Sequence, residues 1–343
     1  MKEFAEAIAR LDAIPRLRYG HYPTPLEELP RLRAALGANA PRLFVKRDDY
    51  TGAGFGGNKV RKLEYVLAQA QANGAEIAIT IGGEKSNHAR VTAAMCARLG
   101  LRCVLVLNAA AVSHAGWEPA SLAADKFYGA EIHLVSSRDE RHTTMWALAE
   151  QFRREGEEVV EIPLGASIPL GAYGFVKAIE ELKTQLAALD IGITHIFHAS
   201  SSGGTQAGLV AGCQFYGLET QVIGISPDDS ADSIAEAVND IICGIGAFLE
   251  APLREGITVL DQYIGPGYGR PTPGMVDALR LLARHEGVLA DPVYTGKGLD
   301  GLFTRLRQRR FAPDEDVIFV HTGGSAGLFG YRWAFADEPP SAA

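Results

Sequence analysis

Short apolar segments alternate with amphipathic segments along most of the chain, and this alternation constrains the fold more than any other feature. Residues 77–81 form an apolar run, and in the segment before it, 61–73, apolar residues recur at helical spacing until Gly74. The pattern predicts strands at residues 43–46, 77–81, 103–107, 131–135, 158–162, 195–199, 221–225 and 317–321, and helices at 61–73, 88–99, 120–128, 143–155, 174–189, 205–216, 234–249, 274–285 and 299–309. Strands that alternate with helices indicate a largely parallel sheet covered by helices.

The length and composition indicate a protein of two α/β halves. The chain has 343 residues, and no Ser/Gly-rich linker divides them, so the halves are expected to pack tightly. With 47% hydrophobic and 22% charged residues, the composition excludes a disordered chain, a collagen and a coiled coil. The net charge of −8 argues against a nucleic-acid partner. We expect no membrane span and no signal peptide, and the four cysteines lack a paired spacing, so we expect a cytoplasmic protein with reduced thiols.

Three glycine-rich turns each follow a predicted strand, where the backbone can approach a ligand closely. The first, residues 52–59, ends in Lys59, whose amine could form a Schiff base if it were partly withdrawn from water. By itself this pattern favours a surface lysine after a flexible turn. The second, residues 200–208, combines serines, glycines and a threonine, which fits either a phosphate-binding nest or an ordinary capped turn. The third, residues 321–325, is of the same kind.

Other polar side chains lie in positions that suit a ligand site. Ser86, Asn87 and His88 come shortly after a predicted strand, and Ser86 could either cap the next helix or face a ligand. Tyr268 and Tyr294 lie in segments rich in glycine and proline, where a tyrosine either packs or reaches a site. No metal site is predicted. Two of the histidines are three residues apart on one strand and would point to opposite faces, and others lack acidic or sulfur partners at ligand spacing.

Seven strings occur along the chain in the order of one known enzyme family. They are 46–49 (KRDD), 56–64 (GGNKVRKLE), 86–90 (SNHAR), 203–208 (GGTQAG), 265–269 (GPGYG), 291–297 (DPVYTGK) and 321–324 (HTGG). Together they resemble the pyridoxal-phosphate enzymes of the tryptophan-synthase-β-like fold, in the branch that contains ACC deaminase and D-cysteine desulfhydrase. Each string alone is weakly specific, but seven in order argue against chance. They also reverse the interpretation of Lys59 as a surface lysine.

The resemblance implies an α/β fold of two open, twisted, mostly parallel sheets flanked by helices, with pyridoxal 5′-phosphate as cofactor. It implies that Lys59 holds the cofactor covalently and that Asn87 bonds the hydroxyl of the cofactor ring. Thr295 would lie near the pyridine nitrogen. The residues implied to cradle the phosphate, with charge from a lysine, are Ser202, Gly203, Gly204, Thr205 and Lys62.

The resemblance also implies the catalytic groups, the substrate site and the domain division. The implied catalytic residues are Lys59, Ser86, Tyr268 and Tyr294. The substrate, a small amino acid, would contact Ser86, Asn87, His88, Thr322 and Gly323, and Lys85 is a further candidate for such a contact from its position in this sequence. Residues 62–170 would form a small domain, residues 1–61 and 171–343 together would form the large cofactor-binding domain, and the enzyme would be a homodimer.

Two positions separate the branches of the family. The deaminase branch typically has Glu where this chain has Thr295 and Leu where it has Thr322, whereas the desulfhydrase branch matches this chain. An acid at the pyridine nitrogen keeps the cofactor ring a strong electron sink, and a neutral hydroxyl does not. We therefore expect α,β-elimination of a good leaving group, as in a D-cysteine desulfhydrase, giving pyruvate, ammonia and sulfide. Lys59 would be the base, or would relay the proton with Ser86 or Tyr294.

Alternatives remain open at this stage. Lys85, after Glu84, departs from the family pattern, and it either contacts an extra anion on the substrate, which would suit an L-cysteate sulfo-lyase, or pairs with Glu84 on the surface. ACC deaminase is a further alternative within the family. A nucleotide-binding oxidoreductase that uses the first glycine turn would need an acidic residue after the next strand, but glycines 82–83 follow it. The last alternative is a protein that binds the cofactor but has no catalytic activity.

Overall fold

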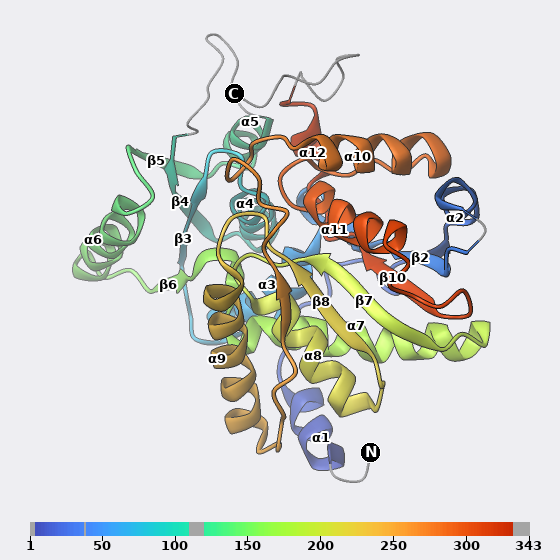
Figure 1. Cartoon of the computed structure of the whole chain (residues 1–343). Helices are drawn as coiled ribbons and strands as arrows, with labels where there is room; N and C mark the ends of the chain where they lie inside the picture. The colour runs from blue at the N-terminus through green and yellow to red at the C-terminus, as the bar shows by residue number, and fades with distance from the viewer. Residues whose placement is uncertain (1–3, 38, 110–119, 332–343) are drawn as a thin grey trace.

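The structure, a computed structural model that describes residues 4–37, 39–109 and 120–331, contains two sheets flanked by helices (Figure 1). The larger sheet has six strands in the order β1-β2-β10-β7-β8-β9, and the smaller has four in the order β5-β4-β3-β6. The strands are β1 Leu26–Glu28, β2 Arg42–Lys46, β3 Ile77–Gly83, β4 Arg102–Asn108, β5 Glu131–Val135, β6 Val159–Ile162, β7 Ile193–Ala199, β8 Gln221–Ile225, β9 Thr258–Leu260 and β10 Asp316–Val320. Neighbouring strands are parallel except β1 and β2. The predicted fold class is confirmed.

Helices follow nearly every strand, as the alternation of the sequence predicts. They are α1 Ala5–Ala13, α2 Pro30–Leu36, α3 Asn58–Ala72, α4 Asn87–Leu99, α5 Ala120–Phe127, α6 Glu140–Arg154, α7 Pro169–Leu189, α8 Gly204–Tyr216, α9 Ala231–Leu249, α10 Pro273–Glu286, α11 Thr295–Arg307 and α12 Ser325–Leu328. Short 3-10 turns lie at Asp48–Tyr50, Ala53–Phe55 and Leu164–Ala166. The predicted helices are all present, and the sequence pattern missed the short elements α1, α2, α12, β1 and β9.

The helix α3 begins earlier than the spacing of apolar residues predicts. It starts at Asn58 rather than at residue 61, directly after Gly57, whose φ of +111° lets the chain turn from the glycine loop into the helix. Lys59 therefore lies in the first turn of a helix and not in the loop before it. This position fixes the direction of the lysine backbone, which a flexible turn would not do.

The helix α11 also begins earlier than predicted, at Thr295 rather than at residue 299. The cause is Asp291, whose carboxylate accepts hydrogen bonds from the backbone amides of Val293, Tyr294 and Thr295 at 2.8, 2.8 and 2.9 Å. These amides would otherwise lack partners at the start of the helix. The segment after Asp291, which we expected to be a loop, is thus the capped start of a helix.

Helices cover both faces of the larger sheet. On one face, residues such as Ile196, Ile318 and Val222 pack against α1, α7, α8 and α9. On the other face, Phe197 and Phe319 pack against α2, α10 and α11. Successive residues of a strand point to opposite faces, so β10, which is buried on both sides, is a continuous apolar run from residue 317 to 320.

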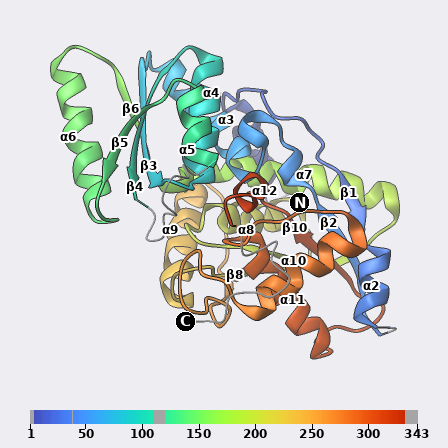
Figure 2. The same ribbon diagram turned by 90° about the horizontal axis from the view of Figure 1, so that it is seen from above.

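The smaller sheet is covered in the same way. The residues Ile77, Ile79 and Ile81 of β3 pack against α6, whereas Ala78 and residues of β4 pack against α3, α4 and α5 on the other face. Figure 2 shows the smaller sheet and α6 set to one side of the larger sheet. All four strands of the smaller sheet lie between residues 77 and 162. The division into domains at residues 62 and 171 stays a prediction.

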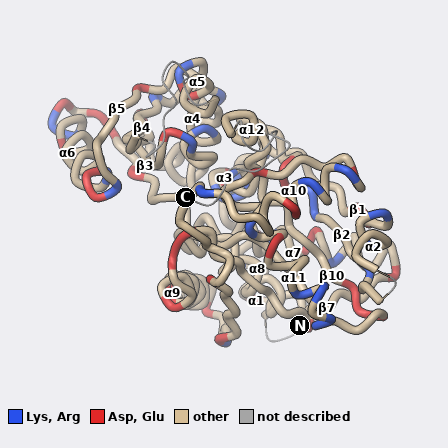
Figure 3. Tube along the Cα trace, turned by 45° about the horizontal axis from the view of Figure 1, so that its top comes forward, with Lys and Arg blue, Asp and Glu red and all other residues tan. Residues whose placement is uncertain are grey.

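Three further features of the described residues are the distribution of charge, the state of the cysteines and the hydropathy of the helices. Lysines, arginines and acidic residues are interspersed along the chain, for instance on α6 (Figure 3). Cys96, Cys103 and Cys213 are buried and Cys243 is exposed, all four as free thiols. Among the helices of the described residues, none is long and apolar enough to cross a membrane.

Candidate active site

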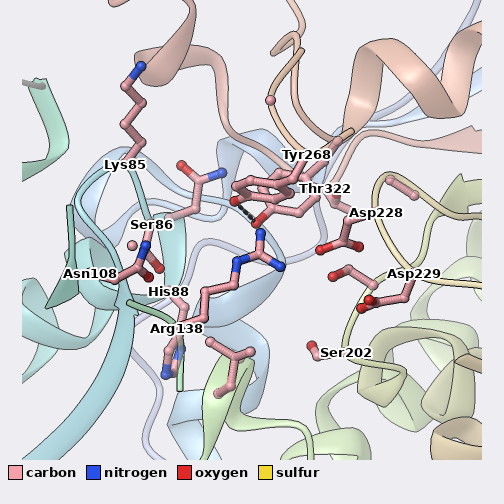
Figure 4. Close-up of a pocket in the computed structure, with 18 of the residues that line it drawn as sticks. Lys85, Ser86, His88, Asn108, Arg138, Ser202, Asp228, Asp229, Tyr268 and Thr322 are labelled. Carbon is pink, nitrogen blue, oxygen red and sulfur yellow. Dashed lines mark hydrogen bonds between the residues drawn. The ribbon is translucent and has the colours of Figure 1, made fainter. Parts of the chain in front are cut away.

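A cavity of about 890 Å³ opens where the carboxyl ends of strands from both sheets meet (Figure 4). Segments that follow β3, β4 and β5 line it from the smaller sheet, and segments that follow β7, β8 and β10 line it from the larger sheet. Ligands of open α/β sheets bind at the carboxyl ends of the strands. The cavity is therefore the candidate site.

The structure brings most of the expected site residues into this one cavity. Those that line it are Lys59, Lys85, Ser86, Asn87, His88, Ser202, Gly203, Thr205, Tyr268, Tyr294, Thr322 and Gly323. Three expected residues, Lys62, Gly204 and Thr295, are not among the lining residues. Residues that are far apart in the sequence thus lie around one cavity, and the other three expected residues lie outside its lining.

Lys59 is a desolvated amine in the cavity wall. Its ammonium group makes no hydrogen bond or ion pair with any described residue. Burial lowers the pKa of Lys59 from 10.5 to about 8. An amine of this pKa is present partly in its neutral, nucleophilic form near neutral pH.

Two glycine turns position Lys59 by packing against each other. The backbone amide of Asn58 donates to the carbonyl oxygen of Thr322 at 2.9 Å. A Cβ on Gly57 would lie 2.9 Å from that oxygen, and a Cβ on Gly323 would lie 2.6 Å from the Cα of Gly57. Only glycine permits this approach. The first and third glycine turns are thus two halves of one structural unit.

The second glycine turn forms a site for an anion at the start of α8. Gly203 takes a φ of +78°, and the helix has no side-chain cap. The buried hydroxyl of Ser200 has no hydrogen-bond partner among the described residues. A Cβ on Gly204 would lie 2.8 Å from the Cα of Ser167, which keeps the backbone bare at this point. Free amides at a helix N-terminus, together with an unpaired hydroxyl, fit a phosphate group.

Lys62 supports this turn from behind. Its ammonium donates to the carbonyl oxygen of Gly165 at 3.2 Å and to the hydroxyl of Ser167 at 3.0 Å. Ser167 in turn hydrogen-bonds Ser202 at 2.7 Å. Burial, and then the charge of Lys59, hold the pKa of Lys62 well below its usual value. The Lys62 ammonium lies beside the turn, 2.9 Å from where a Cβ on Gly204 would be, and its expected contribution of charge to the phosphate site stays a prediction.

The start of α4 presents polar groups to the cavity. Ser86 caps the helix by accepting from the amide of Ala89 at 3.2 Å, as one interpretation predicts, and it also lines the cavity, so the cap does not exclude a contact with a ligand. The side-chain oxygen of Asn87 accepts from Arg90 at 2.7 Å. His88 shares a hydrogen bond with Thr80 at 2.9 Å, and burial holds its pKa well below the usual value, so the ring is neutral.

Tyr268 and Tyr294 form a hydroxyl pair on the opposite wall. Their oxygens are 2.5 Å apart, and their rings meet edge to face with centroids 5.8 Å apart. Burial raises the pKa of Tyr268 to about 12 and also raises that of Tyr294. Both hydroxyls are therefore protonated near neutral pH, and one of them donates to the other.

Two of the expected side chains have partners that the sequence did not indicate. The hydroxyl of Thr295 donates to the carboxylate of Asp291 at 2.6 Å, and Thr295 is not among the residues that line the cavity, so its position near the pyridine nitrogen stays a prediction. The Lys85 ammonium lies 4.3 Å from the centre of the Tyr331 ring and points away from Tyr268 (Figure 4), although other atoms of Lys85 line the cavity. The sequence placed both residues in the right neighbourhood but could not give the direction of their side chains.

Several lining residues were missed by the sequence analysis. They are Asn58, Asn108, Arg138, Arg141, Asp228 and Asp229. Five of them lie at or after the ends of strands: β4 ends at Asn108, the segment with the two arginines follows β5, and the two aspartates follow β8. A polar residue after the end of a predicted strand is the sequence signal that these five share. The sequence analysis names such residues only where a glycine turn or a serine follows the strand.

Comparison with known proteins agrees with this geometry. A family model for pyridoxal-phosphate-dependent enzymes matches residues 17–323. An ACC deaminase homologue of known structure superposes with a TM-score of 0.87 at 32% identity, covering 96% of this chain and 97% of that one.

More distant structures share the fold alone. The processed form of a threonine deaminase from Solanum lycopersicum has a TM-score of 0.64 at 17% identity, with 94% of this chain and 90% of that one covered. The diaminopropionate ammonia lyase of Escherichia coli has a TM-score of 0.68 at 16% identity, with 96% and 90% covered. The family match over most of the sequence, the desolvated lysine and the phosphate-binding turn lead to one conclusion: the chain belongs to the pyridoxal-phosphate-dependent enzymes, and pyridoxal 5′-phosphate is its cofactor.

Proposed function

We propose that the enzyme catalyses α,β-elimination from a small β-substituted amino acid. D-cysteine, which would release sulfide, is the leading substrate, and L-cysteate, which would release sulfite, is the second candidate. The observation that carries the proposal is the amine of Lys59, with its pKa near 8 and no partner among the described residues, in one cavity with the hydroxyls of Ser86 and Tyr294. This set can remove a proton from one carbon and assist departure from the next.

Different residues of the cavity would bind the cofactor phosphate, the cofactor ring and the substrate carboxylate. The amides at the start of α8 and the hydroxyl of Ser200 would hold the cofactor phosphate, and Lys59 would attach the cofactor covalently. Asn87 would contact the cofactor ring, and the start of α4, with Ser86 and His88, would receive the substrate carboxylate. Bound pyridoxal phosphate supplies an electron sink for the electron pair released at the α-carbon.

The chain's own groups move the protons. The Nζ of Lys59 accepts the proton from the α-carbon, which its lowered pKa permits near neutral pH. The bond between the β-carbon and sulfur breaks, and its electron pair leaves with the sulfur. The hydroxyl pair of Tyr268 and Tyr294 can donate a proton towards the departing group. The three-carbon product then takes up one water and yields pyruvate and ammonia, so the reaction needs no oxidant or reductant.

Position 295 favours elimination over the opening of a cyclopropane ring. Thr295 is neutral, and its hydroxyl is already committed to Asp291. A ring nitrogen without an acidic partner makes a weaker electron sink, which suits a leaving group that departs readily. The ACC deaminase alternative therefore ranks below the two sulfur compounds, although one of the similar structures is that of an ACC deaminase homologue.

An absorbance spectrum of the purified enzyme tests the cofactor attachment. We expect a visible band that disappears in Lys59→Ala and remains in Lys85→Ala, which removes another amine of the same cavity. A band that survives in Lys59→Ala would show that Lys59 does not hold the cofactor.

A substrate panel tests the reaction. Pyruvate together with sulfide or sulfite would support elimination and identify the leaving group, with both enantiomers of each substrate assayed. Formation of 2-oxobutanoate from ACC, with no pyruvate from the sulfur compounds, would overturn the proposal. Binding of a nicotinamide nucleotide, measured by calorimetry, would revive the oxidoreductase alternative, which the family match disfavours.

A further inference from the structure

Arg138 reaches into the cavity from the loop between β5 and α6. Figure 4 shows its guanidinium in the middle of the cavity, between Tyr268 and Asp228. The Cζ atom lies 4.7 Å from the centre of the Tyr268 ring, a distance typical of a cation–π contact. The side chain is thus held against one member of the hydroxyl pair.

Arg138 and its neighbour Arg141 are two cationic side chains that lie close together in the cavity wall. No described carboxylate forms an ion pair with either guanidinium, and the Nε of Arg141 donates to the carbonyl oxygen of Arg138 at 3.0 Å. Burial, and then the charge of Arg138, lower the pKa of Arg141. Asp228 is close enough for the charge of Arg138 to lower its pKa, but burial raises that pKa overall. Asp139 is close enough for its charge to raise the pKa of Arg141, but within the described residues neither arginine has a carboxylate at ion-pair distance, so two adjacent cations face the cavity.

The remaining charges of the cavity do not account for this pair. Five side chains with a positive charge line it, against two aspartates: Lys59, Lys85, Arg138, Arg141 and Arg270 against Asp228 and Asp229. The cofactor phosphate and the substrate carboxylate already have proposed sites at the starts of α8 and α4. The ammonium of Lys85 is turned towards Tyr331. The arginine pair is thus left for a further anion.

We propose that Arg138, assisted by Arg141, binds a second acidic group of the substrate, a sulfonate on the β-carbon. This inference rests on the proposed elimination. Within it, the inference favours cysteate, which carries a second acidic group, over cysteine, which does not. Guanidinium groups bind such anions through paired hydrogen bonds. The contact with Tyr268 places the anion beside the hydroxyl pair, where the leaving group departs.

With a sulfonate, the step is balanced without any co-reactant. Lys59 takes the α-proton, a carbon–carbon double bond forms, and the carbon–sulfur bond breaks with its electron pair going to sulfur, which leaves as sulfite. One water then converts the remaining three-carbon unit to pyruvate and ammonia. Arg138 would stabilise the negative charge both before and after the bond breaks.

The test compares holoenzyme variants on substrates that differ in this one charge. Cysteate carries the acidic group, and β-chloroalanine carries a neutral leaving group. We expect Arg138→Gln to lower kcat/KM for cysteate by about 10- to 100-fold more than for β-chloroalanine, the range for loss of a hydrogen bond to a charged group. Arg138→Lys should recover part of the loss. Added salt should raise KM for cysteate in the wild type and much less in Arg138→Gln.

Lys85→Gln is the matched comparison, because the sequence alone points to Lys85 as the anion contact. We expect this variant to leave the ratio of the two kcat/KM values unchanged. A fall in that ratio in Lys85→Gln, with none in Arg138→Gln, would overturn the assignment. An equal loss on both substrates in Arg138→Gln would also overturn it, since Arg138 would then bind the common carboxylate or act structurally.

A binding measurement separates this inference from the proposed function. Aspartate carries the second acid without a good leaving group, and asparagine is its neutral counterpart. If D-cysteine, cysteate and β-chloroalanine all give no pyruvate, the proposed elimination fails. The arginine site is still tested by whether the cofactor absorbance responds to aspartate at lower concentration than to asparagine, and whether Arg138→Gln removes that difference. Equal responses in the wild type would refute the site.

Discussion

Two neighbouring amines dominate the electrostatics at the scale of single residues. Lys59 and Lys62 both lie in the first part of α3, and burial lowers the pKa of each. Removing an ammonium from water without a counter-ion disfavours the folded state. The hydrogen bonds of Lys62 offset part of this free-energy cost, whereas Lys59 makes no hydrogen bond with the described residues. A residue kept at such a position points to function rather than stability.

Replacing Lys59 should therefore stabilise the enzyme once the cofactor is removed. Because the pKa of Lys59 is about 8 in the folded chain against 10.5 otherwise, the unfolded chain binds more protons between these values. Stability thus rises with pH across that window, and the full penalty is present below pH 8. We expect Lys59→Met to raise the free energy of unfolding of the apoenzyme at pH 7 by roughly 1–3 kcal/mol, measured by urea denaturation.

Lys177→Met provides the control for that measurement. Burial lowers the pKa of Lys177, but hydrogen bonds to Asp12 and Glu180 raise it overall. This substitution should give no stabilisation. A loss of stability in Lys59→Met would mean that the amine has a favourable partner in the apoenzyme.

The contact between the glycine turns gives a second prediction at this scale. Gly57→Ala should destabilise the protein, because its backbone angles favour glycine and its Cβ would meet the carbonyl oxygen of Thr322 at 2.9 Å. Gly37→Ala is a matched control, since φ and ψ are +113° and 162° at Gly37 against +111° and 174° at Gly57, with nothing within 4 Å of a Cβ there. We expect Gly57→Ala to lose about 1–3 kcal/mol more than the control and to bind less cofactor. Equal losses would mean that the turns can separate freely.

At the scale of secondary structure elements, one lysine ties three segments together. Lys297 of α11 donates to the carbonyl oxygens of Pro227, Ile264 and Gly267 at 2.9, 2.7 and 2.9 Å. Pro227 follows β8, and the other two precede Tyr268. Burial lowers the pKa of Lys297 to about 8, although the charge of Asp228 raises it. The ammonium thus fixes the loop that presents Tyr268 to the cavity.

Lys297→Met should loosen that loop without opening the sheets. Three carbonyl oxygens would lose a charged donor, and each buried group left unpaired costs about 1–3 kcal/mol unless water replaces the donor. We expect faster hydrogen exchange in residues 264–270 and a lower kcat, with exchange in β7 and β10 unchanged. Unaltered exchange at 264–270 would show that the loop is held by other contacts.

The sequence predicted this level of structure unevenly. Long apolar periods gave the strands and helices, because burial on a sheet face selects for them directly. The starts of α3 and α11 depend instead on a glycine angle and on the carboxylate of Asp291, which periodicity does not register. Arg138 follows the end of a predicted strand, but its place in the cavity depends on the order β5-β4-β3-β6, and sequence does not give the order of parallel strands.

At the scale of the whole molecule, the site is shared by two sheets. Lys59, Ser86 and Arg138 approach from α3 and the smaller sheet, whereas the phosphate-binding turn and Tyr294 belong to the segments of the larger one. Neither sheet holds a complete set of groups. A ligand that contacts both sides is therefore expected to stabilise both together.

Removal of the cofactor should show this shared dependence. Cofactor at 100 to 1,000 times its Kd stabilises the folded state by about 3–4 kcal/mol, so the apoenzyme should have a lower Tm. We expect hydrogen exchange to increase at the carboxyl ends of both β3 and β7 in the apoenzyme. An increase confined to the larger sheet would contradict joint stabilisation.

The position of β10 has a consequence for how the polypeptide is made. This strand, residues 316–320, lies between β2 and β7 and pairs with both, so the middle of the larger sheet comes from a late part of the sequence. During synthesis, β2 and β7 are made long before β10, the strand that lies between them. Until β10 is made, the backbone groups of β2 and β7 that pair with it have no partner strand. The glycine turn at 321–324, which holds Lys59 in place, follows later still. The nascent chain therefore cannot complete its cofactor site until this turn has been synthesised and has packed against the turn before Lys59.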